Sequence, residues 1–180
     1  MAFQFASQAY SVSRYGDLLT DFWQQYRSEV EAALHRMGLD QHLATIEQGL
    51  NSDNETGWRA GVLACRSLLE DLAAHLWKDT RPTYNALPGD GPEGRLAVTA
   101  DRYVNHLSAY LHLREETSPG GRFIRDEANR LSSSLRALVG YQGTAHSPIT
   151  KLDARSIALG TYFLIGELTS KTDLEPVEAY

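Results

Sequence analysis

The residues between Glu55 and Lys78 carry the pattern that most limits how this chain can fold. A stripe of apolar side chains with three- and four-residue spacing, the period of an α-helix, is made by Trp58, Val62, Leu63, Cys65, Leu69, Leu72, Ala73, Leu76 and Trp77. A stripe this wide indicates a central helix that is mostly buried. The helix is expected to end at Arg81 and Pro82, because proline cannot continue the helical hydrogen-bond ladder.

The same helical period appears on both sides of this stretch. Further helices are expected at about residues 18–37, 40–50, 101–116, 123–139 and 150–168. Gly38 ends the first of these, and Thr150 to Asp153 resembles a capping box at the start of the last. No segment alternates with period two, so no sheet is predicted.

These patterns predict an all-α fold, a single helical bundle over residues 15–170. The bundle is expected to have four long helices plus a short extra helix, one fewer than the six stretches that show the helical period. Residues 1–14 are interpreted as an extended or loosely ordered N-terminal arm, and residues 171–180 as an acidic, frayed tail. Residues 80–99 contain closely spaced glycines and prolines and are expected to form a long loop. Such a loop is either a slack crossover or a functional lid.

The charge balance limits the partners. Lys and Arg total 17 and Asp and Glu total 23, so the formal net charge is −6. A duplex-binding domain carries a basic face, so bulk nucleic-acid binding is not expected, although one local basic pocket is compatible with this balance. Neither a signal peptide nor an apolar run long enough to span a bilayer is visible, so no membrane association and a cytoplasmic location are expected.

Most motif classes are excluded by spacing. The chain contains no glycine-rich phosphate loop, no HExxH motif and no GxSxG nucleophile elbow. Its one cysteine, Cys65, lies on the apolar side of the central helix and is expected to pack there as an inert thiol. The six histidines include no pair at i,i+4 spacing, so no metal site is predicted, and no cofactor is expected.

Two features outside the packing pattern are candidates for chemistry. Arg66 sits within the apolar central helix, and a partly buried arginine needs an acceptor. It is therefore expected either to anchor a loop or to present its charge in a cleft. The second feature is a glycine-containing link, residues 140–148, which carries His146. An imidazole there is expected to titrate near neutral pH. The alternative interpretation of the same residues is a helix that ends at a glycine and is followed by an ordinary loop histidine.

Five blocks carry a family resemblance: residues 64–73 (ACRSLLEDLA), 101–107 (DRYVNHL), 143–146 (GTAH), 153–155 (DAR) and 160–168 (GTYFLIGEL). Their order and spacing resemble the helical domain of AbiTii-like bacterial proteins, which are associated with abortive infection. That domain is in turn similar to the wider HEPN class of helical bundles. The resemblance implies a HEPN-like bundle, a dimer, and a role in antiviral defence or toxin–antitoxin systems, where many HEPN proteins cut RNA.

The catalytic signature of HEPN nucleases is an Arg followed after four to six residues by a His, and it is not present in the resembling region. The arginine nearest before His146 is Arg136. One formal match, Arg36 with His42, lies near the N-terminus on either side of Gly38. Whether the chain is an enzyme is therefore left open by its sequence.

Three hypotheses remain. The first is a non-catalytic defence protein that acts through self-association or a protein partner. The second is an RNA-cleaving toxin with a displaced site, in which His146 is the general base and Arg66 or Arg136 binds phosphate. Tyr103 and Asn105 would complete its RNA-binding cleft. The third is a small nucleotide or signalling ligand held in a local basic cleft, since a small anion needs only two or three donors.

Overall fold

The computed structural model describes the greater part of the chain. The described residues are 2–78, 83–85, 95–97, 103–113, 126, 127, 129, 130, 133, 148–171 and 174–176. Side chains are described for 20–78, 103–107, 109, 110, 126, 127, 129, 130, 133, 148–170 and 174–176. The helices are α1 (Ala2–Met37), α2 (Gln41–Asn51), α3 (Glu55–Leu76), α4 (Tyr103–Leu113) and α6 (Lys151–Lys171). Two short strands, β1 (Thr83–Asn85) and β2 (Arg95–Ala97), pair antiparallel. The described part of the chain is therefore predominantly helical, as the all-α prediction requires.

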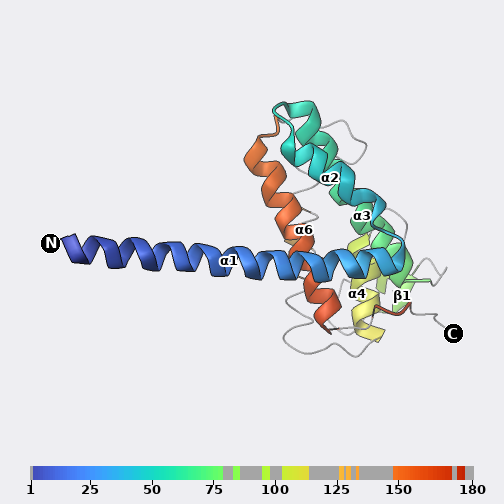
Figure 1. Ribbon diagram of the computed structural model, residues 1–180. Coiled ribbons are helices and arrows are strands. Elements are labelled where there is room, and N and C mark those ends of the chain that lie inside the picture. The colour runs from blue at the N-terminus through green and yellow to red at the C-terminus, as the bar shows by residue number, and fades with distance from the viewer. Residues whose placement is uncertain are drawn as a thin grey trace.

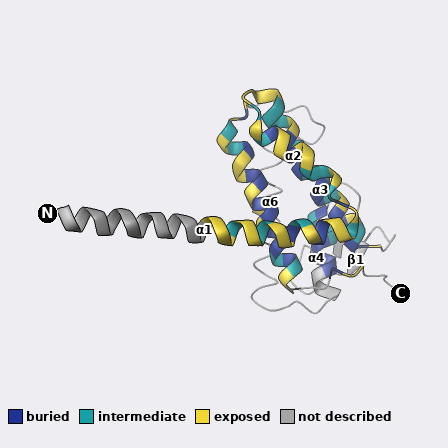
Figure 2. Cartoon of the chain, viewed as in Figure 1, coloured by how far each residue is buried: buried dark blue, intermediate teal, exposed yellow. Residues whose placement is uncertain are grey.

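Helix α3 is the centre of the molecule, as its apolar stripe predicts. It packs against α2, α4 and α6 (Figure 1). Its stripe supplies side chains that are entirely buried, among them Val62, Leu69 and Leu72. Figure 2 shows that buried residues gather on α3, α4 and α6, whereas exposed residues predominate on α1 and on the outer side of α2.

Local signals in the sequence set several helix ends. Gly38, at φ +71°, closes α1 with a left-handed residue, and the amides of Gly38 and Leu39 donate back to the carbonyls of His35 and Leu34. This is the Schellman arrangement that glycine favours. The predicted capping box is also confirmed: the Thr150 amide donates to Asp153 Oδ2 at 2.9 Å, and the Asp153 amide donates to Thr150 Oγ1 at 3.2 Å.

Helices α2 and α3 touch backbone to backbone where two glycines meet. A Cβ atom on Gly49 would stand 2.6 Å from the Cα atom of Gly61 and 2.8 Å from the carbonyl oxygen of Gly57. Any side chain at Gly49 would therefore separate the two helices. This close approach lets α2 pack tightly against α3, and α2 also contacts α6.

Helix α1 crosses α6 with its C-terminal part, while its N-terminal part extends far beyond the rest of the molecule (Figure 1). Val30, Ala33 and Leu34 are buried at the packed end. Tyr26 marks the crossing, since its hydroxyl donates to the backbone carbonyl of Phe163 at 3.1 Å. The packed and projecting parts belong to one continuous helix.

The structure differs from the sequence predictions in several segments. The arm expected over residues 1–14 is part of α1, which begins at Ala2, because serine lowers helix propensity only slightly. The loop expected over 80–99 contains β1 and β2, whose three residues each are too few to show alternation. In the tail that was expected to fray, Leu174 is buried. The helix expected at 123–139 lies mostly outside the described residues.

Candidate functional site

Of the predicted site residues, Arg66, Tyr103 and Asn105 lie within the described structure, and none of these three lines the cavity between α1, α2 and α6. Tyr103 and Asn105 are on α4, where Tyr103 is buried in the core and Asn105 is half-buried. His146 and Arg136 lie outside the described residues, so the catalytic pair stays a prediction. The convergence of these groups with Arg66 in one cleft likewise remains untested.

Arg66 finds its acceptor on its own helix. Its Nε atom lies 2.8 Å from Glu70 Oε1, one turn further along α3, and the two side chains are 21% and 31% exposed. This ion pair satisfies the requirement that a partly buried guanidinium be given a hydrogen-bond acceptor. Glu70 thus pairs with the positive charge of Arg66, which in the RNA-cleaving hypothesis would bind a phosphate group.

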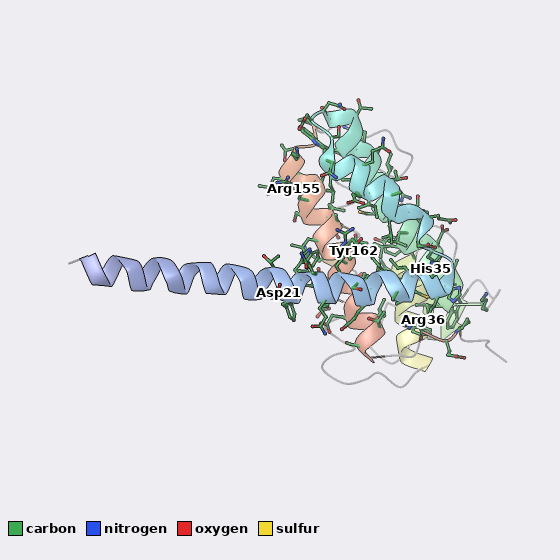
Figure 3. All side chains as sticks on the ribbon, in the orientation of Figure 1. Asp21, His35, Arg36, Arg155 and Tyr162 are labelled. Atoms are coloured by element: carbon green, nitrogen blue, oxygen red, sulfur yellow. The ribbon has the colours of Figure 1, made fainter. Side chains whose placement is uncertain are left out.

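The formal Arg36–His42 match does not form a pair in the structure. Gly38 separates the two residues onto different helices, and the imidazole of His42 instead contacts Asp71 of α3, with Nε2 2.7 Å from Oδ2. Arg36 is exposed at the end of α1 (Figure 3). His42 therefore joins α2 to α3.

A cavity of about 360 Å³ lies between α1, α2 and α6. It is lined by Trp23 and Arg27 of α1, by Ile46, Glu47, Leu50 and Asn51 of α2, and by Arg155, Ala158, Leu159 and Tyr162 of α6. Figure 3 shows Arg155 near the start of α6 and Tyr162 at the crossing with α1. The cavity thus follows α6 from its N-terminal turns to that crossing.

Aromatic rings form the end of the cavity at the crossing. Trp23 and Tyr162 meet edge to face, with ring centroids 6.0 Å apart and an interplanar angle of 60°. Behind them, Trp23 also contacts Phe163 at 6.0 Å and Tyr26 at 6.1 Å. Edge-to-face and offset contacts are the favoured arrangements of aromatic pairs. The wall therefore combines aromatic side chains from two helices.

A charged network lies beside the aromatic wall. Arg27 Nε is 2.6 Å from Glu31 Oε1, and the Tyr162 hydroxyl donates to the same oxygen at 3.2 Å. Burial, followed by the charge of Glu31, raises the pKa of Tyr162 to about 12, so this hydroxyl stays protonated at neutral pH. The hydrogen bond to Glu31 raises the pKa of Arg27. Glu47 lies 4.0 Å from Arg27 Nη2 and is mostly exposed.

Arg155 differs from Arg27 in having no ion pair with any residue that the structure describes. It is exposed, and it lies about two turns before Tyr162 on the same helix. A planar guanidinium with five N–H donors binds carboxylate and phosphate groups well. Arg155 is thus the available positive charge of the cavity.

The cavity was missed by sequence reasoning, although two blocks of the family resemblance contain part of it. Arg155 ends the block DAR, and Tyr162 belongs to the block GTYFLIGEL. Trp23 and Arg27 are more than a hundred residues earlier, so no local spacing connects them to α6. Only the crossing of α1 over α6 brings them together.

Among the described residues, no group of three or more His, Cys, Asp or Glu side chains is placed to hold a metal ion. None of the helices in the described ranges combines the length and apolar character needed to cross a membrane. Comparison of the chain with protein-family models, curated proteins and solved structures finds no match.

Proposed function

We propose that this chain is a non-catalytic helical protein of bacterial anti-phage defence, HEPN-like and similar to AbiTii proteins, that acts in the cytoplasm by forming a homodimer. The observation that carries the proposal is the projecting part of α1 (Figure 1). The defence role rests on the five sequence blocks that resemble AbiTii-like proteins. The ion pair of Arg66 with Glu70 favours the non-catalytic form of the hypothesis over the RNA-cleaving one.

The projecting part of α1 carries the sequence pattern of a helix that packs against another helix. Apolar residues with alternating three- and four-residue spacing are Val12, Tyr15, Leu19, Phe22 and Tyr26, and Phe5 precedes them by one heptad. On an α-helix this spacing forms one continuous seam, the a and d positions of a coiled coil. The seam runs into the packed end of α1 at Tyr26.

Phe22 is where the seam leaves the body of the protein. Its side chain is 62% exposed, and its ring stacks on Tyr26 at 6.2 Å. Phe163 and Leu159 of α6, 41% and 43% exposed, extend the apolar surface along the neighbouring helix. Isolated helices owe little stability to propensity alone and are held by burial of an apolar face. A second copy of the same seam would supply that burial in a twofold-symmetric contact.

The proposal is tested by phage challenge of bacteria that express the chain. Phe22→Asp places a charge on the seam, whereas Leu152→Asp changes a side chain that is 75% exposed at the start of α6 and serves as the matched control. We expect wild type and Leu152→Asp to lower the efficiency of plating, and Phe22→Asp to lose this protection. His146→Ala should keep it.

Three outcomes would contradict the proposal. Protection by a Phe22→Asp protein that is monomeric in solution would separate defence from self-association. Loss of protection in His146→Ala, with the dimer intact, would favour the RNA-cleaving alternative. A chain that gives no protection against a broad set of phages would remove the defence role itself.

A further inference from the structure

The cavity between α1, α2 and α6 has the dimensions of a small-molecule site. Its volume of about 360 Å³ falls within the usual range of ligand pockets, roughly 300–1,000 Å³. Ile46, Leu50 and Leu159 give it apolar surfaces, and all of its lining residues stand on helices. Sites built on helices hold their side chains more precisely than sites built on loops. The cavity therefore has the size and the helix-borne lining that a small-molecule site needs.

The aromatic corner of the cavity suits a planar ring. Because Trp23 and Tyr162 are inclined at 60°, a flat ligand ring that stacks on one of them presents its edge to the other. Stacked and edge-to-face contacts are the two favourable arrangements of aromatic groups. A ligand with a flat heteroaromatic group would use this corner better than an aliphatic one.

The polar groups of the cavity select the other parts of the ligand. Arg27 is engaged by Glu31 at 2.6 Å, so Arg155 is the lining cation available to an anionic group. The carboxylate of Glu47 only accepts hydrogen bonds, whereas the amide of Asn51 both donates and accepts. A matching ligand carries N–H donors at one place and an anion at another.

We infer that this cavity binds a nucleoside monophosphate whose base has N–H donors on its edge. The base lies in the corner of Trp23 and Tyr162, Glu47 accepts from the base edge, and Arg155 binds the phosphate. Guanine fits this set best, because it presents adjacent N–H donors to one carboxylate, while uracil presents a single N–H. The inference does not depend on self-association and concerns residues that no hypothesis from the sequence included.

Calorimetric titration of the full chain with GMP tests the inference, with guanosine, ribose 5-phosphate and UMP as partial ligands. Guanosine lacks the phosphate, ribose 5-phosphate lacks the base, and UMP lacks the paired donors. We expect GMP to bind and each partial ligand to bind more weakly, by roughly tenfold to a hundredfold for a lost charge-assisted hydrogen bond.

Substitutions then assign the contacts. Arg155→Ala should weaken GMP binding by roughly tenfold to a hundredfold and leave the affinity for guanosine unchanged. Arg36→Ala is the matched control, since Arg36 is an exposed arginine near the C-terminal end of α1 (Figure 3) and does not line the cavity. Glu47→Gln should reduce the preference for GMP over UMP. Both cavity substitutions change exposed side chains, so the fold should be retained.

The inference is overturned by any of three results. Absence of GMP binding at millimolar concentration would show that the cavity does not take this ligand class. Equal weakening by Arg155→Ala and Arg36→Ala would reduce the effect to general charge attraction. Equal affinities for GMP and guanosine would remove the phosphate contact.

Discussion

Tyr26 of α1 lies directly over Gly166 of α6: a Cβ atom on Gly166 would stand 2.0 Å from the Tyr26 hydroxyl oxygen. The same hydroxyl donates to the carbonyl of Phe163, three residues before Gly166. Glycine at this position therefore permits the closest approach of the two helices. Because Tyr26 is also the last residue of the apolar seam, this contact fixes the point from which α1 projects.

Gly166→Ala should destabilise the protein. Alanine is favoured over glycine in a helix interior by up to about 1 kcal/mol, but overpacking against the Tyr26 ring outweighs that gain. We expect the free energy of unfolding in urea to fall by about 1–3 kcal/mol. In a Tyr26→Leu background the same substitution should be neutral or stabilising, because the clashing ring atoms are gone. An equal loss in both backgrounds would show that Tyr26 does not constrain Gly166.

The capping box of α6 should make stability depend on pH in the acid range. The Thr150 hydroxyl donates to Asp153 Oδ2 at 2.7 Å, and this bond, together with that of the Thr150 amide, lowers the pKa of Asp153. A carboxyl with a lowered pKa in the folded state stabilises the protein above its unfolded pKa, roughly 4, and loses this contribution as the pH falls through the folded value.

Unfolding of wild type and Asp153→Asn in urea, compared between about pH 6 and pH 2, checks this expectation. Wild type should lose more stability on acidification than Asp153→Asn, whose amide does not titrate. Thr150→Ala should cost about 1 kcal/mol at neutral pH, the usual effect of losing an N-cap side chain. Parallel pH profiles for wild type and Asp153→Asn would refute the contribution of this carboxylate.

Cys65 should be unreactive while the protein is folded. Its side chain is fully buried, and burial raises the pKa of the thiol to about 12. Because the thiolate is the reactive species, a thiol reagent such as an aromatic disulfide should react slowly in native buffer at about pH 8 and rapidly in urea. Cys65→Ala should give no signal, since the chain has one cysteine. Rapid stoichiometric labelling of native protein would contradict the burial.

The sequence was sufficient where one short segment determines the structure. Gly38 alone ends α1, and Thr150 with Asp153 starts α6, because each acts on its own backbone neighbours. The central position of α3 also follows from its own stripe. The N-terminal extent of α1 was missed because its serine residues resemble a loop in composition, yet they are tolerated within a long helix.

The candidate site could not be predicted in the same way. Trp23 meets Tyr162, and Tyr26 meets Gly166, across the crossing of α1 and α6, and each pair is separated by more than a hundred residues. Periodicity assigns a residue to a helix face but does not say which faces meet. Arg66 was interpreted from the sequence as a partly buried charge that needs an acceptor, and in the structure that acceptor is Glu70, one turn away on the same helix.

The molar mass of the full chain in solution tests the proposed dimer most directly. Sedimentation equilibrium at micromolar concentration should give about twice the chain mass of 20.0 kDa for wild type and for Leu152→Asp. Phe22→Asp should give the mass of a single chain, because the charge interrupts the apolar seam of α1. A wild-type mass of one chain across this concentration range would contradict self-association through α1.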